Sequence, residues 1–418
     1  MADTHTKLNA GYNVMSLRAD FPILGEKMRG KRFVYLDNAA TSLKPQSVID
    51  AEVSYYTRMG ANIHRGAYEF SERATLAFDA TREKLAHFIN KPADGQIIFT
   101  KGSTEGINMV AAGWARRKLT AGDEIVTTQI EHHADLVPWQ EVARETGAVL
   151  KFLPIDPETG TIRLEDVEKT IGERTRLVAV TAMSNVTGYM PPVREIIRIA
   201  HRHNAVVLLD GAQYVSHHPV DVTDLDCDFL VFSGHKMLGP TGTGVLYGKE
   251  HLLDQMAPLN YGGDMILKVW NDHSTYKELP DRFEGGTPNI AGIIGLGAAV
   301  DYLLNLGMDK IAAHEHELVE YLVERSAGLT DVSVYTAQDP EHRGGIFSFN
   351  VEGVHSHDVG AVLDNEGVAV RTGFHCAQPY MRLLGVPGTV RASVYLYTSR
   401  EDIDTFIHAL SKVKEVFR

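Results

Sequence analysis

Cysteine is scarce in this chain of 418 residues, which contains only Cys227 and Cys376. Two distant thiols make no disulfide framework, which favours a reducing cytosol, and they exclude a thiolate-rich zinc or iron–sulfur site within one chain. The 19 histidines show no HExxH-type spacing. We therefore predict no resident metal, and either cysteine can still be a buried apolar side chain or a reactive thiol.

Long apolar runs and an excess of basic charge are missing as well. No run approaches the roughly 20 residues that cross a bilayer, and the N-terminus lacks the basic and apolar regions of a secretion signal. The formal net charge is −13, opposite in sign to the basic face of most nucleic-acid-binding domains. We expect a cytoplasmic protein that binds neither membrane nor nucleic acid.

Length and patterning indicate two α/β domains, because 418 residues exceed one compact core. Between about residues 95 and 250, short apolar runs alternate with helical patterns, which predicts a mostly parallel seven-stranded sheet covered on both faces. The last two runs are close together, so we expect an antiparallel strand at one edge. The runs are GQIIFTK, DEIVTTQ, AVLKFLP, RLVAVTAMS, AVVLLDGAQ, FLVFSGHK and GTGVLYG.

The remaining sequence predicts a smaller α/β domain at the C-terminal end. Helix-like and strand-like stretches follow FEGGTPN, and the chain closes with the helical pattern REDIDTFIHALSKVKEVF. We place the large domain at residues 35–300 and the small domain at 301–418. Residues 1–34 are expected to pack against the small domain.

Polar stretches follow five of the predicted strands: STEG, EHHAD, SNVTG, DGAQ and SGHK. The ligand crevice of an open α/β sheet lies outside the carboxyl ends of its strands. These stretches are therefore expected to converge on one site.

Three of these stretches carry distinct chemistry. KGSTEGIN, residues 101–108, begins a helix whose free N–H groups suit a phosphate, although a simple N-cap explains it as well. Asp210 ends an apolar strand and needs a partner such as a protonated ring nitrogen, or a salt bridge. Lys236 closes another apolar strand, where desolvation makes an amine nucleophilic towards carbonyls, unless it is a solvated turn residue. Together they match the phosphate, ring nitrogen and aldehyde of pyridoxal 5′-phosphate.

The chain resembles a known family from YLDNAAT at residues 35–41 onward. It is similar to the aspartate-aminotransferase-like fold type I pyridoxal-phosphate enzymes, in the class V aminotransferase group, and within that group to the SufS-type cysteine desulfurases. The matching stretches are LDNAAT, NIHRG, STEGIN, EHHADLVPW, SNVTG, DGAQ, DCDFLVFSGHKMLGPTG, FEGGTPN, RTGFHCAQP and VRAS.

The resemblance implies a role for each matching residue. Lys236 would bind the cofactor and act as general acid and base, His132 would stack on its ring, and Asp210 would pair with the ring nitrogen. Cys376 would be the nucleophile that accepts sulfur. Further implied cofactor contacts are Asn185, Gln213, Thr104, Glu105, Ser233, His235 and, in a homodimer, Thr287 of the partner subunit. Implied substrate contacts are Ala40, Arg65, Asn185, Arg371 and Arg391.

The resemblance also implies the reaction. L-Cysteine would lose its α-proton to Lys236, and the Cys376 thiolate would take the substrate sulfur, leaving alanine and a persulfide that supplies iron–sulfur cluster assembly. Only a thiolate can do this, so the loop should be electropositive or next to a base, and His375 is expected to contribute. Cys227, at the entry to an apolar strand, is interpreted as structural.

Three positions depart from the usual SufS pattern. Phe374 replaces the first histidine of GHHCA, Asp135 replaces the asparagine of EHHAN, and Thr398 replaces the asparagine of YNT. The short cysteine loop is typical of the SufS group and not of the longer-loop IscS/NifS group. Phe374 removes any acid/base role at its position.

The stretch VHSHDV, residues 354–359, resembles VHPHDV in enzymes of this type that work with the zinc-containing acceptor SufU. The resemblance implies that His357 is a ligand of that partner's zinc, which favours a SufU-type acceptor over a SufE-type one. The alternative is an ordinary surface histidine.

Two other functions fit parts of the sequence. A selenocysteine lyase or related β-eliminating lyase would use the same cofactor without needing Cys376. A sulfur-carrying interaction protein with no chemistry of its own would need Cys376 but gives Lys236 no role.

Overall fold

The seven apolar runs form one sheet in the computed structural model, which describes residues 12–156, 159–329 and 331–417. The α/β class and the mostly parallel seven-stranded sheet are confirmed. The strands lie in the order β4-β10-β9-β8-β7-β5-β6. Their bounds are β4 (Gly95–Thr100), β5 (Glu124–Thr128), β6 (Val149–Leu153), β7 (Thr175–Thr181), β8 (Val206–Asp210), β9 (Phe229–Ser233) and β10 (Gly244–Lys249).

The antiparallel strand is β10, and it does not lie at the edge of the sheet as expected. A short connection from β9 forces β10 to run back beside it, because only a long crossover could make the pair parallel. The first strand of the chain, β4, then pairs with the free edge of β10. The prediction of one antiparallel strand was right, but its position at the edge was wrong.

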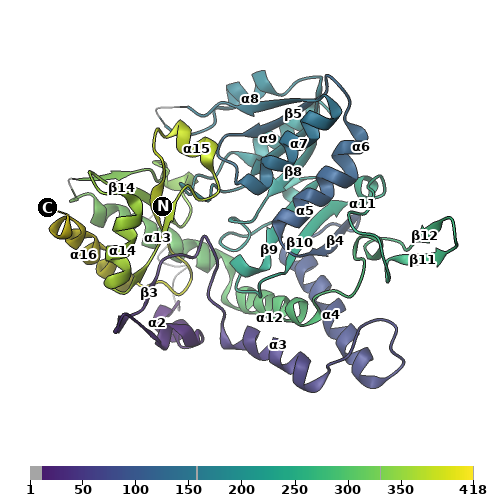
Figure 1. The fold of residues 1–418 in the computed structure, drawn as a ribbon, viewed down its shortest axis with the longest axis horizontal. Coiled ribbons are helices and arrows are strands. Elements are labelled where there is room, and N and C mark those ends of the chain that lie inside the picture. The colour runs from purple at the N-terminus through teal and green to yellow at the C-terminus, as the bar shows by residue number, and fades with distance from the viewer. Residues whose placement is uncertain (1–11, 157–158, 330, 418) are drawn as a thin grey trace.

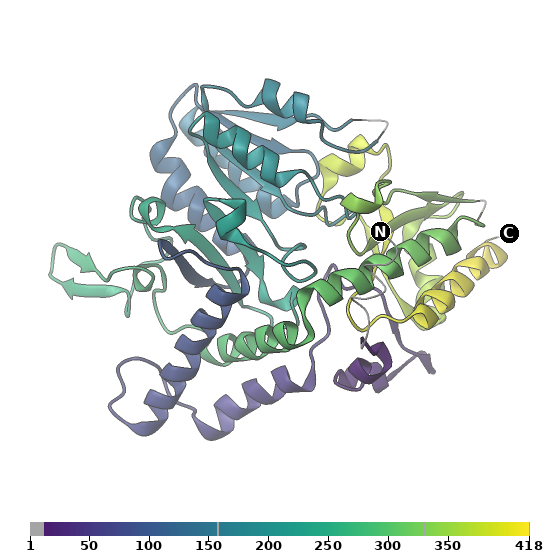
Figure 2. The same cartoon turned by 180° about the vertical axis from the view of Figure 1, so that it is seen from behind.

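Helices cover both faces of this sheet because its strands alternate between two apolar cores. Ile125, Leu177 and Leu208 pack with α5 and α7 on one face. Val126 and Val178 belong to the core of the other face, with α4, α8, α9 and α12 (Figures 1 and 2). The helices span α4 (Glu69–Phe88), α5 (Ser103–Val110), α7 (Val137–Thr146), α8 (Leu164–Thr170), α9 (Val193–Arg202) and α12 (Ile290–Leu306).

The small domain is a four-stranded antiparallel sheet with the order β13-β14-β17-β16. Phe347 and Phe349 of this sheet pack against Phe406 in a separate core. Its elements are β13 (Val332–Val334), β14 (Ile346–Val351), β16 (Arg371–Gly373), β17 (Thr389–Ser393), α13 (Met308–Ser326), α14 (Ser356–Asn365), α15 (Gln378–Leu383) and α16 (Arg400–Val416).

The chain passes between the domains at the junction of α12 and α13, which meet at 75° (Figure 2). α12 packs against α4 and α3 (Gln46–Arg58), whereas α13 packs against α16 and β14. The predicted boundary at residue 300 therefore falls inside α12. Within the described ranges, no single helix is long and apolar enough to cross a membrane, and α12 and α13 meet that test only as a bent pair.

The N-terminal segment, described from residue 12 on, contacts the small domain. The Tyr12 hydroxyl donates to the Leu396 carbonyl at 2.6 Å, and Arg18 forms an ion pair with Asp402 at 2.6 Å. β3 (Val34–Tyr35) pairs in parallel with β15 (Val368–Ala369). The part of the 1–34 prediction that concerns residues 1–11 lies outside the described residues.

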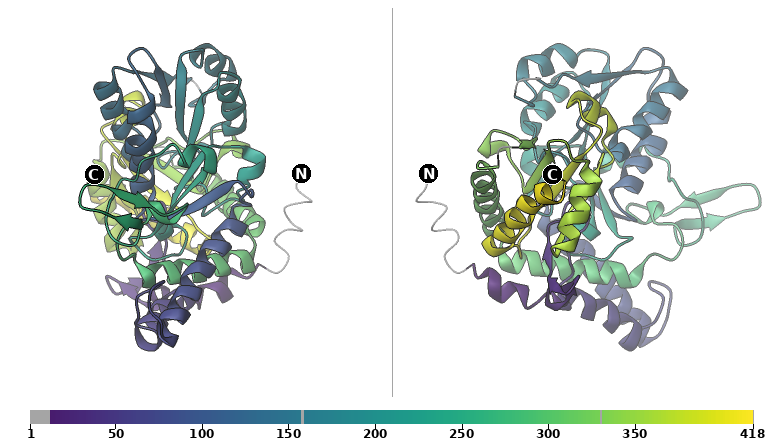
Figure 3. Two further views of the ribbon diagram at one scale, coloured as in Figure 1. Left: turned by 90° about the vertical axis from the view of Figure 1, so that its right-hand side faces the viewer. Right: turned by 60° about the vertical axis from the view of Figure 1, so that its left-hand side comes forward.

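A two-stranded hairpin projects from the large domain (Figures 1 and 3). It consists of β11 (Ile266–Val269) and β12 (Ser274–Tyr276). The remaining short elements are α2 (Val14–Arg18), α6 (Arg116–Lys118), α10 (Val222–Leu225), α11 (Glu250–Leu253), β1 (Lys27–Met28) and β2 (Lys31–Arg32).

A largely buried ion pair attaches the segment that follows this hairpin to the sheet. Arg82 of α4 holds both carboxylate oxygens of Glu284, at 2.8 and 2.9 Å, and its guanidinium lies 4.4 Å from the Phe99 ring centroid. The Phe99 N–H of β4 donates to the same carboxylate at 2.7 Å. Glu284 thus positions the stretch that carries Thr287.

Substituting Arg82→Met should lower the free energy of unfolding by about 3 kcal/mol, because it leaves the Glu284 carboxylate buried without its cation. Urea unfolding of the purified protein measures this loss. The double variant with Glu284→Leu should recover part of it, since no unpaired charge then remains. A loss in the double variant equal to the sum of both single losses would contradict this account.

Candidate active site

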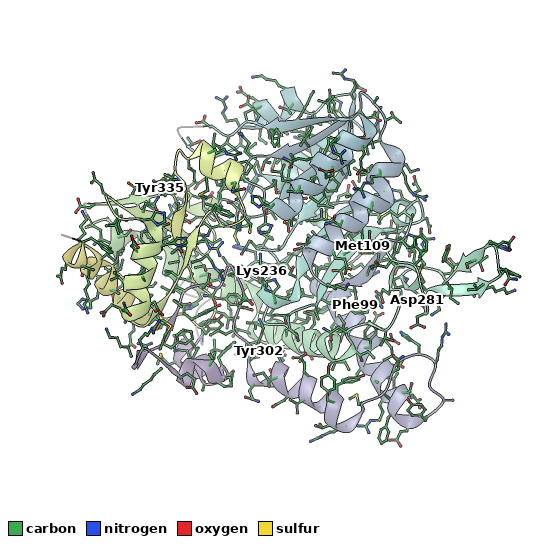
Figure 4. All side chains as sticks on the ribbon, viewed as in Figure 1. Phe99, Met109, Lys236, Asp281, Tyr302 and Tyr335 are labelled. Atoms are coloured by element: carbon green, nitrogen blue, oxygen red, sulfur yellow. The ribbon has the colours of Figure 1, made fainter. Side chains whose placement is uncertain are left out.

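The carboxyl ends of the large-domain strands and the facing edge of the small domain enclose a cavity of about 240 Å³. Figure 4 shows Lys236 between the two domains. Most of the residues predicted for the site line this one cavity. They are Ala40, Thr104, His132, Asn185, Asp210, Gln213, Ser233, His235, Lys236, Arg371, Cys376 and Arg391.

Lys236 stands where β9 ends in one turn of 3₁₀ helix, Gly234–Lys236. Gly234 is required in this turn, because a Cβ there would overlap the Thr243 hydroxyl. Burial lowers the pKa of Lys236 to about 8, and the nearby Asp210 carboxyl opposes that shift. Lys236 is therefore a partly deprotonated amine near neutral pH, as a nucleophile towards a carbonyl must be.

Asp210 ends β8 and is buried. Its Oδ1 accepts the Ala212 N–H at 2.9 Å. Burial raises the pKa of Asp210, while the Ala212 N–H and Lys236 lower it. Such a carboxyl is stabilised when a cationic group lies against it, which fits a protonated ring nitrogen.

His132 is held as a neutral ring beside the cavity. Its Nδ1 accepts the Ala134 N–H at 3.0 Å and caps the 3₁₀ turn His133–Asp135. Burial, with a contribution from Lys236, lowers the pKa of His132 to about 4. An uncharged imidazole with its orientation fixed by a backbone N–H suits stacking on a heteroaromatic ring.

The phosphate end of the site lies at the start of α5. The Ser103 N–H donates to Ser233 Oγ at 2.9 Å, and the two hydroxyls are 2.9 Å apart. Thr104 and His235 complete this end of the cavity, and burial with Lys236 lowers the pKa of His235 to about 4. Ser103 was missed in the sequence, although its place before Thr104 at the predicted N-cap could have indicated it.

Two arginines from the small domain face the cavity. Arg391 of β17 is buried and donates from Nη1 to the Asn185 carbonyl at 2.6 Å. Arg371 of β16 holds the Asp37 carboxylate with Nε at 3.2 Å and Nη2 at 2.7 Å. Arg391 Nη2 lies 3.7 Å from the same Asp37. Asp37 was missed, since nothing in its sequence context indicates that it orients both arginines.

Several buried polar atoms around the cavity have no partner. Asn185 Nδ2 donates to the His375 carbonyl and Gln213 Nε2 to the Ala39 carbonyl, each at 2.7 Å. Their oxygens, together with Arg391 Nε, remain without a hydrogen bond among the described residues. Buried polar atoms are normally paired, so a polar ligand is needed to complete this site. A flat, anionic cofactor with a ring nitrogen and a phosphate fits the residues present.

The Cys376 loop is strained and tied to the large domain. His375 and Cys376 have φ angles of 49° and 54°, a left-handed conformation that non-glycine residues rarely adopt. The His133 N–H donates to the Cys376 carbonyl at 2.7 Å. Cys376 itself is exposed. The loop therefore presents its thiol at the mouth of the cavity.

His375 contributes no positive charge to the surroundings of the thiol, so a nearby base is the contribution that stays predicted for it. Burial and Arg391 lower the pKa of His375 to about 3, and its Nε2 lies 2.9 Å from the Thr389 hydroxyl, so the ring is neutral. Arg371 and Arg391 both interact electrostatically with Cys376 and supply the positive charge.

Phe374 and Cys227 have simpler surroundings. Phe374 is 45% exposed and stacks on His133, with ring centroids 6.2 Å apart. Cys227 is fully buried, and burial raises its pKa to about 12. Cys227 is thus an unreactive core thiol.

Four predicted residues lie outside the cavity. Glu105 caps its own helix by accepting the Lys101 N–H at 2.6 Å, and together with Thr287 it lines a second cavity of about 180 Å³. Arg65 is mostly exposed and 3.4 Å from Asp264. His357 is exposed at the start of α14. Across the described residues, no group of three or more His, Cys, Asp or Glu side chains is placed to hold a metal ion.

Known proteins of similar sequence are described as cysteine desulfurases. A protein of Halalkalibacterium halodurans described as a probable cysteine desulfurase is 51% identical, over 97% of this chain and 99% of the relative. A cysteine desulfurase of Escherichia coli is 45% identical, over 96% of this chain and 98% of the relative.

Solved structures agree with the sequences. The apo structure of a cysteine desulfurase from Thermococcus onnurineus superposes with a TM-score of 0.91 at 41% identity, covering 96% of this chain and 98% of the other. The cysteine desulfurase CsdA of Escherichia coli superposes with a TM-score of 0.90 at 40% identity, covering 97% and 99%. The family model for class V aminotransferases matches residues 34–406, and the chain therefore belongs to the class V aminotransferase family.

Proposed function

We propose that this protein is a cysteine desulfurase that converts L-cysteine into L-alanine and holds the sulfur as a persulfide on Cys376. The observation that carries the proposal is one cavity lined by both the half-buried amine Lys236 and the exposed thiol Cys376. A non-catalytic sulfur carrier would need only the thiol. The persulfide supplies sulfur for iron–sulfur cluster assembly.

The cofactor is pyridoxal 5′-phosphate, which when bound withdraws electrons from the substrate Cα. Lys236 would hold it covalently, Asp210 would pair with its ring nitrogen and His132 would stack on its ring. Ser233 and His235 would bind its phosphate, with Thr104 at the N-terminus of α5. Asn185 and Gln213 would offer to its remaining polar groups the amide oxygens that have no partner among the described residues.

Arg391, Lys236 and Cys376 each have a separate role in the proposed reaction. Arg391 binds the substrate carboxylate, since its guanidinium is buried and has a free Nε. Lys236 Nζ removes the proton from the substrate Cα. The Cys376 thiolate attacks the substrate sulfur and the Cβ–S bond breaks, so that one cysteine and one thiol become one alanine and one persulfide. Arg371 and Arg391 place positive charge near the attacking sulfur.

Replacing the thiol tests this proposal. Cys376→Ala should lower alanine formation from L-cysteine at least ~100-fold, because no acceptor for the sulfur remains. It should retain the yellow cofactor and turn over L-selenocysteine, whose selenium leaves more easily. Cys227→Ala is the matched control and should keep the turnover of L-cysteine. Full cysteine turnover by Cys376→Ala would instead favour a β-eliminating lyase.

A second copy of the chain completes the site, in our proposal, as a homodimer. Large apolar side chains are exposed on and near the β11–β12 hairpin, a pattern that marks interfaces. Leu267 and Val269 are 64% and 62% exposed, and Tyr261, Trp270 and Tyr276 lie nearby in sequence. Thr287 follows this hairpin in the chain, outside its own subunit's active-site cavity, so Thr287 of the partner subunit would reach the phosphate.

The double variant Leu267→Asp and Trp270→Asp should raise the dimer dissociation constant at least ~10-fold, since charge is then placed in an apolar interface. Sedimentation velocity at several concentrations measures this. Leu164→Asp, which charges an exposed leucine on α8 instead, is the control and should remain dimeric. An unchanged dissociation constant in the double variant would show that the hairpin is not part of the dimer interface.

The acceptor that we infer is a zinc-containing protein of the SufU type, and the short cysteine loop favours the SufS type of enzyme. The supporting observation is that His357 is exposed close to the cysteine loop. Its Nε2 lies 3.9 Å from the place where a Cβ on Gly373 would stand. An exposed imidazole there is free to join a partner's zinc. The two free cysteines support a reducing, cytoplasmic location.

His357→Ala should abolish most of the stimulation of alanine formation by a zinc-loaded SufU-type acceptor, while the rate without acceptor stays the same. His408→Ala, on the exposed face of α16, is the matched control. Equal stimulation of the wild type, His357→Ala and His408→Ala would exclude the zinc contact. Stimulation by a SufE-type acceptor alone would show that the acceptor is of the SufE type.

A further inference from the structure

Three carboxyl groups are buried together beside the active-site cavity. Glu131, Asp135 and Asp210 are 1%, 0% and 4% exposed. Only Asp210 has a place in the proposed reaction. Glu131 and Asp135 have no place in it, so the burial of two further acids needs a physical reason.

Glu131 and Asp135 each have one oxygen satisfied by a neutral donor. The Thr128 hydroxyl donates to Glu131 Oε1 at 2.6 Å, and Trp139 Nε1 donates to Asp135 Oδ1 at 2.8 Å. The second oxygens, Glu131 Oε2 and Asp135 Oδ2, are buried without a donor among the described residues. Glu131 acts electrostatically on Asp135, and a proton held between the two carboxyl groups would supply the missing donor.

The surroundings do not neutralise two negative charges. β7 presents the Thr181 backbone to Glu131, and β8 presents the Asp210 carboxyl to both acids. Burial raises the pKa of Glu131 and of Asp135, and Asp210 raises both further. Lys236 acts on Asp210, and His132 is neutral. Two ionised carboxylates in contact at such a place would repel strongly, as in other buried acid pairs.

We propose that Glu131 and Asp135 share one proton, and that the hydrogen bond made by this proton positions the turn that carries His132. Residues 131 and 135 flank that turn, and His132 caps it through the Ala134 N–H. A hydrogen bond from Glu131 to Asp135 would join the two ends of the segment that contains His132. Glu131 and Asp135 are thus positioning residues for the ring that is proposed to lie over the cofactor.

The substitution Asp135→Asn removes the shared proton but keeps a hydrogen bond to Glu131. An asparagine is nearly isosteric, and its amide can donate to Glu131 without any shared proton while still accepting from Trp139. Asp135→Ala removes both the proton and the bond. Glu131→Gln is the reciprocal change, because the new amide can donate to Asp135.

The shared proton has a measurable signature in stability. In the unfolded chain both acids ionise near pH 4, whereas the folded pair keeps one proton above that pH. Unfolding near neutral pH therefore releases one proton from the pair, and this part of the stability falls as pH rises. Asp135→Asn and Glu131→Gln should each release about one proton fewer on unfolding, so their stability should depend less on pH.

The experiment follows urea unfolding between about pH 5.5 and 7.5 for the full chain, with and without bound cofactor. Glu415→Gln, which removes an exposed carboxyl near the C-terminus, is the control and should match the wild type. Infrared difference spectra between the wild type and Asp135→Asn should show the carbonyl band of a protonated carboxyl in the wild type alone. Equal proton release by wild type and Asp135→Asn, or the absence of that band, would overturn the shared proton.

The positioning part is tested by cofactor binding, and this part alone rests on the proposed function. Asp135→Asn should retain the wild-type affinity and visible spectrum of bound pyridoxal 5′-phosphate, whereas Asp135→Ala should weaken binding about tenfold, because Glu131 then lacks a donor. Equal affinity of the two variants would overturn the positioning role. The proton count is measured without cofactor or substrate, so failure of the desulfurase proposal would leave it intact.

Discussion

The active site depends on the partial burial of one amine. Lys236 follows an apolar strand to the wall of the cavity, where Asp210 is the nearby countercharge and Arg391 adds repulsion. A buried amine loses its proton readily, and that property makes it both a nucleophile and a base near neutral pH. The neutral rings of His132 and His235 follow from the same burial and from the same neighbouring charge.

The reactive thiol comes from the other domain, and the two halves of the site meet only because loops cross the interface. Asn185 of the large domain holds the His375 carbonyl, and the His133 N–H holds that of Cys376. Asp37 binds Arg371 and approaches Arg391, so one carboxylate orients both cations of the small domain. The strained backbone at residues 375 and 376 is stable because these contacts determine it from both sides.

Much of the fold could be predicted because local patterns encode it. Seven apolar runs became seven strands, and Asp210 and Lys236 stand at strand ends as their neighbours indicated. The position of β10 could not be predicted, since either edge of a growing sheet can accept a strand. The charge of His375 could not be predicted either, because an imidazole has a pKa near neutrality in water and only its burial beside Arg391 makes it neutral.

The sequence by itself determined the class of fold and indicated the cofactor chemistry, because residue types placed after apolar strands carry both. The role of Cys376 as nucleophile was implied only by the resemblance of whole motifs to a known family. The tertiary structure alone decided the charges. Whether a carboxyl, amine or imidazole is ionised depends on burial and on neighbours far away in the chain. The contact between Arg371 and Asp37 and the electrostatic effect of Asp210 on Glu131 illustrate this. Electrostatic energies depend on distance and on the dielectric surroundings, and neither can be predicted from residues that are adjacent in the sequence.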